Sequence, residues 1–199
     1  MLYPSAMVPL HLFEPRYLEL MEDLLAEGKR ELVVGTLLPG WEDEYFKTPP
    51  IAKVVGVGEI MQHEKDEHGN FNILLRGKFR AVVVDETLSG RPYRLVDIEP
   101  HTENEISAED ASAAHARLLE AITALAGATP QGASAHSVNY LTDILLVHLS
   151  VSMERKLAVF CELNPLERVR LVMAEFEHQQ QVGRSIPTPD QTPDDPQWN

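Results

Sequence analysis

Two β-rich stretches, IAKVVGVGEIMQ (residues 51–62) and FNILLRGKFRAVVV (residues 71–84), stand out in this chain of 199 residues. Both are rich in β-branched and aromatic residues, which are typical of strands. The segment between them, EKDEHGN (residues 64–70), is charged and carries Gly69 near its tip, as a hairpin turn requires. The sequence therefore predicts a β-hairpin here.

Upstream of the hairpin, one helix and one further strand are predicted. Pro15 suits the first turn of a helix, and Gly28 suits the position just past its end. Between them, apolar residues recur at helical spacing and form one stripe. These residues are Tyr17, Leu20, Met21, Leu24 and Leu25. Residues 31–38 read as a buried strand, which Pro39 and Gly40 end.

Downstream, residues 92–98 predict one more short strand, and beyond Pro100 the pattern becomes helical. Helices are expected near residues 107–127, 138–151, 153–163 and 166–180. Ser107 can cap the first of these, and Asn164 can cap the last, with Glu167 as its capping-box partner. Several short strands followed by several helices predict an α+β protein with a small barrel or open sandwich, not a parallel sheet.

The domain organisation follows from these elements. Residues 1–103 are expected to form a β-rich barrel subdomain with one early helix, and residues 104–181 a helical bundle subdomain. Residues 182–199 hold four prolines among polar residues. Such a composition buries too little surface to order itself, so a disordered Pro-rich tail is predicted.

Composition limits the classes of function. The formal net charge is -14 at pH 7, and clustered Lys and Arg supply most of the affinity for phosphate backbones, so nucleic acid is not expected as the main ligand. The single cysteine, Cys161, forms no internal disulfide. The N-terminus lacks the pattern of an export signal, and no apolar run approaches the length of a membrane span. A cytoplasmic protein without a membrane partner is expected.

Four segments, in the same order along the chain, resemble the family of the N-terminal substrate-binding domain of Lon proteases. They are VPLHLFEPRY (residues 8–17), VGEI (residues 57–60), FNILLRGKFR (residues 71–80) and PYR (residues 92–94). Weaker similarity continues through the predicted helices. The resemblance implies a PUA-like pseudo-β-barrel followed by a C-terminal helical bundle. It also implies recognition of protein substrates or damaged chains in ATP-dependent proteolysis.

The N-terminus departs from the family pattern. Family members usually begin with an extra strand rich in Leu, Phe and Pro, whereas this chain begins at the point that Leu2, Tyr3 and Pro4 resemble. Either the first barrel strand lies upstream of Met1, or the barrel has an unpaired edge. An unpaired edge would be a site for strand addition by an extended peptide.

No catalytic residues are predicted. The sequences around Gly28 and Gly77 lack the earlier glycine and the following Ser or Thr of a P-loop, and no segment resembles the Ser-Lys protease part of Lon. Ser152 and Lys156 are four residues apart on a predicted helix and could meet as nucleophile and base. A capping serine and a surface lysine explain them better.

No metal or cofactor is predicted. The eight histidines lack the ligand spacing of a zinc site, and His63 and His68 flank the charged turn. Cys161 lies on the apolar face of a predicted helix, where a small buried hydrophobe is commoner than a reactive thiol.

Five aromatic residues are candidates for substrate binding. Trp41, Tyr45 and Phe46 lie in an acidic loop, where exposed rings would contact an unfolded chain, although a loop that folds back and buries its rings fits equally well. Phe13 and Tyr17 could line a groove, but aromatic residues at helical spacing are more often core, and core is favoured for both.

The leading hypothesis is a non-catalytic module that binds exposed apolar segments of unfolded or damaged proteins, in a groove between barrel and helices. An ATP-dependent protease is a candidate partner. The alternative is an RNA-binding or regulatory PUA-like module, suggested by the basic cluster of Arg76, Lys78 and Arg80. Alternating strand residues that face solvent explain this cluster equally well. A hydrolase that uses Ser152 is a third hypothesis.

Overall fold

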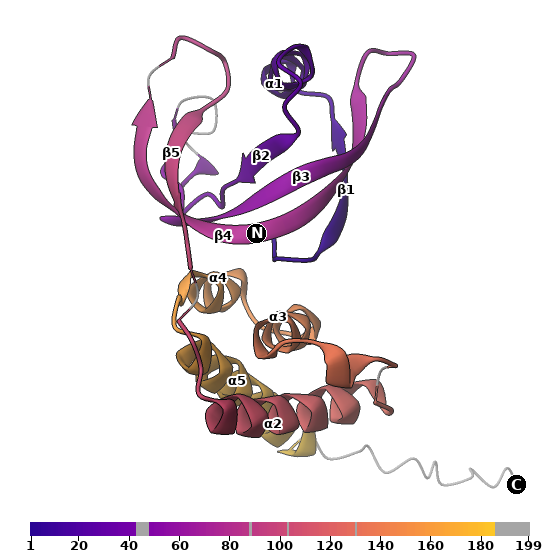
Figure 1. Ribbon diagram of the computed structural model, residues 1–199, viewed down its shortest axis with the longest axis vertical. Helices are drawn as coiled ribbons and strands as arrows, with labels where there is room; N and C mark the ends of the chain where they lie inside the picture. The colour runs from indigo at the N-terminus through magenta and orange to yellow at the C-terminus, as the bar shows by residue number, and fades with distance from the viewer. Residues whose placement is uncertain (43–47, 88, 103, 130, 186–199) are drawn as a thin grey trace, which may run out of the picture.

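The computed structural model describes residues 1–42, 48–87, 89–102, 104–129 and 131–185. The chain forms a β-rich part that contains one helix and, below it in Figure 1, a helical part. The first part consists of β1 (Met7–Leu12), α1 (Pro15–Ala26), β2 (Glu31–Val34), β3 (Val54–Lys65), β4 (Phe71–Thr87) and β5 (Leu95–Pro100). The second consists of α2 (Ala108–Ala126), the short 3-10 helix η2 (Ala133–Ala135), α3 (Val138–His148), α4 (Met153–Cys161) and α5 (Pro165–Ser185). The α+β class is confirmed.

The five strands form one antiparallel sheet in the order β1-β4-β3-β2. The predicted hairpin is its centre, because β3 pairs with β4 from Val54 to Lys65. β4 is long enough to take two partners, since β1 pairs with its first part and β5 with its second. Among the described residues no ladder joins β2 to β1 or β5, so the sheet curves but does not close into a barrel.

Two strand predictions need correction. The strand expected at residues 31–38 ends at Val34, beyond which Leu37 makes only an isolated bridge to Ile51. No strand was predicted at β1, which has Pro9 in its middle although proline cannot donate to a ladder. β1 tolerates Pro9 because it pairs only with β4 and its other side is an edge.

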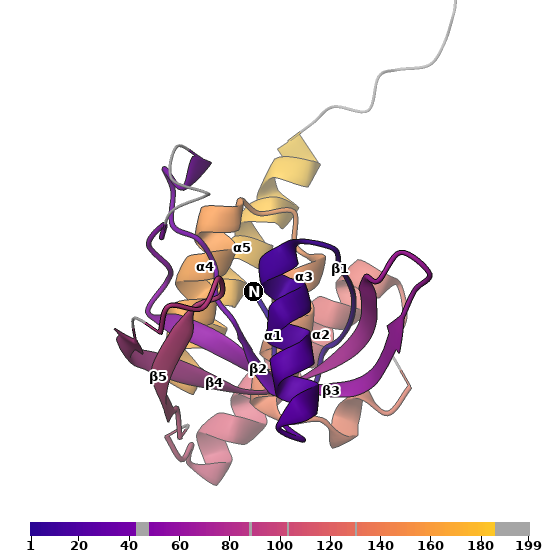
Figure 2. The same cartoon turned by 90° about the horizontal axis from the view of Figure 1, so that it is seen from above.

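Helix α1 provides the apolar cover of the sheet. Figure 2 shows it lying over the curved sheet, with β5 on one side of the helix and β1 on the other. Met21 is fully buried, while the other four residues of the predicted stripe are half-buried. The buried cluster beneath the helix consists of Leu2, Met21, Ile60, Phe71, Ile73 and Leu75.

The helical part has its own apolar core, formed mainly by α2, α3 and α5. The predicted caps at Ser107 and Asn164 are confirmed: Ser107 accepts from the N–H of Asp110, and the side chain of Asn164 accepts from the N–H groups of Leu166 (3.0 Å) and Glu167 (3.2 Å). The capping-box role of Glu167 was wrong. Its carboxylate pairs with Arg170 one turn later, and the N–H of Asn164 donates instead to Glu162.

A buried ion pair joins the two parts. Arg80 of β4 donates to Asp143 of α3 (2.5 Å) and to the carbonyl of Phe160 in α4 (3.2 Å). The Arg80 guanidinium also lies 4.8 Å from the centre of the Phe160 ring, and the rings of Phe160 and Tyr3 form a T-shaped pair with their centres 5.3 Å apart. The N-terminal residues therefore lie between sheet and helices, beside this pair.

The predicted tail, residues 182–199, falls mostly outside the described residues, because residues 186–199 are not among them. Helix α5 continues to Ser185. The backbone of residues 182–185 is therefore helical.

Candidate functional site

A cavity of about 600 Å³ lies in the β-rich part, between helix α1 and strand β5. We call it the α1–β5 cavity. Its walls come from α1, from β2 and the chain after it, and from the connection between β4 and β5. The lining residues are Arg16, Tyr17, Leu20, Val33, Gly35, Leu37, Thr48, Pro49, Ile51, Glu86, Thr87, Ser89, Gly90, Arg91, Pro92, Tyr93, Arg94, Leu95 and Val96.

The lining of this cavity mixes apolar and aromatic side chains with charged and polar ones. Tyr17 contributes a half-buried ring, and the guanidinium of Arg16 lies 4.9 Å from its centre. Leu95 on β5 lines the cavity and remains 40% exposed. Concave surfaces that combine apolar side chains with fixed polar groups are typical of ligand pockets in proteins.

Ion pairs and hydrogen bonds hold the polar groups of the lining in place. Arg94 donates to the carbonyl of Pro49 (2.5 Å) and pairs with Glu86. Tyr93 donates to Asp23 of α1 (2.6 Å), and this hydrogen bond raises the pKa of the phenol. Because the phenol stays protonated at neutral pH, it keeps α1 and the chain before β5 together.

The structure separates the predicted site residues. Tyr17 lines the α1–β5 cavity, whereas Trp41 is half-buried and does not line it. Phe13 is 63% exposed and stacks on His11 at 5.9 Å, so its assignment to the core was wrong. It follows β1 immediately, at the end of an edge strand, where no other element covers it. Tyr45 and Phe46 lie outside the described residues.

Sequence reasoning missed most of the cavity. Tyr93 and Leu95 were read only as strand residues, and Leu20 only as part of the helix stripe. A signal was present at Tyr93, since this aromatic residue follows Gly90 and Pro92 in a turn-rich segment. The groove expected between barrel and helices is not this cavity, which lies wholly within the β-rich part.

The possible Ser152–Lys156 dyad is not formed. Ser152 caps helix α4 by accepting from the N–H of Arg155 (3.3 Å). The ammonium of Lys156 points elsewhere and donates to the carbonyl of Val147 (3.4 Å). The capping interpretation is therefore confirmed for Ser152.

The basic cluster on β4 is divided among three carboxylates. Arg76 pairs with Glu59 (2.6 Å), Lys78 pairs with Glu31, and Arg80 is buried against Asp143. The three cations therefore do not share one solvent-facing surface of the kind that phosphate backbones need.

Within the part of the chain that the structure describes, no group of three or more His, Cys, Asp or Glu side chains is arranged to hold a metal ion. In the same residues, no helix combines the length and the apolar character needed to cross a bilayer. Cys161 is half-buried, and burial raises the pKa of its thiol.

Comparison with known proteins agrees with this architecture. The crystal structure of a Lon N-terminal domain protein from Xanthomonas campestris is similar, with a TM-score of 0.58 and 22% identity, over 87% of this chain and 91% of that chain. The N-terminal domain of the Lon protease of the Mycobacterium avium complex is similar with a TM-score of 0.69 and 15% identity, over 89% and 92% of the two chains. None of the curated proteins matches the chain.

At these identities the two structures establish the fold alone. The family follows from the sequence, because residues 1–177 match the model of the ATP-dependent protease La (LON) substrate-binding domain. That match covers both the β-rich part and most of the helical part. The chain therefore belongs to the family of the Lon substrate-binding domain.

Proposed function

We propose that this protein binds exposed apolar segments of unfolded or damaged proteins, without catalysis of its own, and that the α1–β5 cavity is the main binding site. Membership of a substrate-binding family supports the general role. The observation that carries the finer proposal is the cavity itself, a hollow of about 600 Å³ that exposes apolar and aromatic side chains such as Tyr17 and Leu95 among polar groups held by ion pairs.

The dimensions and chemistry of the cavity suit one or two large apolar side chains of an extended polypeptide. Such side chains lose their contact with water when they enter, which provides about 25 cal/mol for each Å² of apolar surface buried. Folded proteins keep most of these side chains inside, so the cavity distinguishes unfolded from folded partners. The protein would act in the cytoplasm, and an ATP-dependent protease is the partner that would consume the captured substrates.

The test is binding of ribonuclease A in its unfolded and native forms. Fluorescein-labelled ribonuclease A, reduced and carboxamidomethylated, stays unfolded, while the native protein has nearly the same composition and charge. We expect saturable binding of the unfolded form by fluorescence anisotropy and none of the native form. Equal binding of both forms would mean that charge, and not exposed apolar surface, drives the interaction.

Two matched variants locate the site. Leu95→Asn places an amide in the lining of the cavity, and Val84→Asn makes the same type of change at a residue that is 59% exposed but does not line the cavity. We expect Leu95→Asn to weaken binding at least about fivefold, while Val84→Asn stays within about twofold. A peptide array probed with the wild type and with Trp41→Ala would show whether Trp41 contributes.

A further inference from the structure

The sheet leaves one strand edge open beside a second hollow. β2 pairs with β3 only at residues 56–59, and the last backbone bond on this edge runs from the N–H of Ile60 to the carbonyl of Arg30 (2.7 Å). Beyond it, Met61 lies at a register shift, and residues 62–65 of β3 pair with β4 on one side only. We call this segment, residues 61–65, the β3 edge.

The β3 edge is accessible, and beyond Met61 its pairing with β4 is regular. All five of its residues are exposed. A register shift lies between Ile60 and Gln62, after which the pairing with β4 runs without interruption to Lys65. In such a strand, alternate backbone N–H and C=O groups point away from the paired neighbour. Five residues at about 3.3 Å each give an edge of roughly 17 Å.

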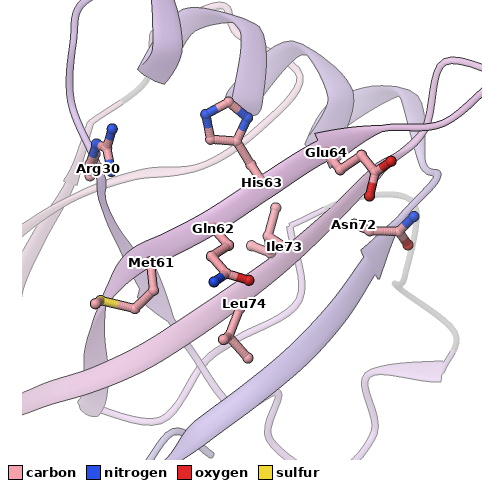
Figure 3. A pocket seen from close by; sticks show the side chains of 8 residues that line it. All are labelled: Arg30, Met61, Gln62, His63, Glu64, Asn72, Ile73 and Leu74. Atoms are coloured by element: carbon pink, nitrogen blue, oxygen red, sulfur yellow. The ribbon is translucent and has the colours of Figure 1, made fainter.

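A hollow of about 570 Å³ is lined by residues 61–64 of this edge, by residues 72–74 of the paired strand β4, and by Arg30. Figure 3 shows Met61 and Arg30 towards one end of it and Glu64 towards the other, with Gln62 and Leu74 between them. Among the described residues, neither the guanidinium of Arg30 nor the carboxylate of Glu64 has an ion-pair partner. An occupant can therefore meet a backbone edge, apolar contact at Met61, and one charge of each sign.

We propose that the β3 edge takes up an extended segment of an unfolded polypeptide as an added strand, in line with β2. This inference rests on the proposed function, which identifies the occupant as an unfolded polypeptide. A row of outward N–H and C=O groups is matched in full only by another extended backbone. Because the backbone of the added strand makes these hydrogen bonds, they add affinity for many peptide sequences. Side chains entering the α1–β5 cavity would supply the preference for apolar sequences.

A second copy of this chain is a poorer occupant of the β3 edge. Each copy carries a net charge of -14, so two copies repel each other at a distance. An edge-to-edge contact would involve only five residues of β3 on each side, against the roughly 20–30 residues per partner of a stable interface.

Amide hydrogen exchange of the full chain tests the proposal, with reduced and carboxamidomethylated ribonuclease A as the probe. In the free protein, the outward amides of residues 61–65 should exchange fast, and those directed at β4 slowly. With saturating probe, we expect the outward amides to slow by at least about tenfold. If the probe binds, and Leu95→Asn weakens that binding, but residues 61–65 keep their exchange rates, strand addition is refuted while the proposed function stands.

Other outcomes also decide between occupants. If the probe does not bind at all, the proposed function fails and strand addition fails with it. If the amides of residues 61–65 become protected as the concentration of the protein rises, without probe, the occupant is a second copy and the proposal is overturned.

A proline substitution provides an independent test. The exchange data for the free protein identify whether Gln62 or His63 has the outward N–H. Proline at that position removes the donor without touching the ladder to β4, and edge strands tolerate it. We expect the proline variant to bind the probe at least about fivefold more weakly than the wild type, because one hydrogen bond is lost. The alanine variant at the same position keeps its N–H and should bind within about twofold of the wild type. Equal affinity of the two variants, with thermal unfolding unchanged, would overturn the proposal.

Discussion

At the scale of single residues, Arg80 and Asp143 matter most for stability. Their side chains are 1% and 5% exposed, and each supplies the countercharge of the other inside the protein. A buried pair of this kind gains little over apolar residues, but removing one partner leaves the other charge unmatched. The pair therefore fixes how β4 and α3 meet and makes the contact sensitive to substitution.

Replacing Asp143 with Asn keeps the shape of the side chain and removes its charge. We expect Asp143→Asn to lower the free energy of unfolding by about 3–5 kcal/mol, because Arg80 stays buried without a carboxylate. Urea denaturation followed by circular dichroism measures this as the total free energy of unfolding, summed over both transitions where the variant unfolds in two. The control is Glu177→Gln at the exposed pair with Arg117, where the change should be under about 1 kcal/mol. If the two substitutions lowered the free energy of unfolding equally, the guanidinium of Arg80 would have to reach water.

Tyr3 gives the protein a dependence on alkaline pH. Burial, and then the nearby charge of Asp143, raise the pKa of Tyr3 from 10.0 to about 12, against the opposing effect of Arg80. In the unfolded chain the phenol loses its proton near its ordinary pKa, so the unfolded state is favoured as pH rises. The contribution of Tyr3 to stability is present in full below pH 10 and is lost as pH rises towards 12.

The variant Tyr3→Phe tests this contribution. Between pH 10 and pH 12 the free energy of unfolding of the wild type should fall more steeply than that of Tyr3→Phe. Urea denaturation at a series of pH values gives both slopes. Parallel slopes would mean that the phenol ionises equally in the folded and unfolded states.

At the scale of elements, glycines of β3 and β4 make room for the N-terminal segment. The chain crosses the sheet so closely that a Cβ on Gly77 would lie 2.0 Å from the carbonyl oxygen of Tyr3, and one on Gly56 would lie 2.3 Å from that of Leu2. Hydrogen bonds fix the crossing, since the N–H of Ser5 donates to Gly77 (2.8 Å). The sheet and the N-terminus therefore fit each other only without side chains at these positions.

Adding a methyl group at Gly77 should displace the N-terminal segment. We expect Gly77→Ala to cost about 1–3 kcal/mol of stability, because the clash is with backbone and the backbone must move. Gly35→Ala is the control: its Cβ would meet Ile51 at 3.5 Å, an ordinary contact, so the change should be neutral or slightly stabilising. Thermal denaturation of both variants makes the comparison, and similar losses of stability would contradict the crossing described above.

At the scale of the whole molecule, the β-rich part and the helical part share one interface. Arg80, Tyr3, Asp143 and Phe160 meet there, and the imidazole of His101 lies 3.0 Å from the carbonyl oxygen of Leu163 nearby. The apolar cores of the two parts are nevertheless separate clusters. Their stabilities are thus coupled through a small number of polar and aromatic contacts.

We expect the wild type to unfold in a single transition, and Asp143→Asn to unfold in two. The substitution weakens the coupling between the parts while each keeps its own core. Urea denaturation followed by far-ultraviolet circular dichroism and by tryptophan fluorescence should give coincident curves for the wild type and separate curves for the variant. Separate curves already in the wild type would show that the two parts unfold independently.

Sequence and tertiary structure each determined a distinct part of this protein. The hairpin of β3 and β4, the helix α1 and the caps at Ser107 and Asn164 follow from local patterns, because hydrogen bonds and side-chain spacing within a few residues are enough to set them. Strand β1 could not be predicted, since only its place at an edge makes Pro9 acceptable.

The site needed the tertiary structure. Tyr17, Ile51 and Leu95 are far apart in sequence, and only the curvature of the sheet beneath α1 brings them around one cavity. The same holds for Arg80, whose partner Asp143 lies 63 residues away. The sequence by itself determined most of the elements and the family, because both depend on the local order of residues. Tertiary structure alone decided which surfaces stay open, because exposure depends on what every other element covers.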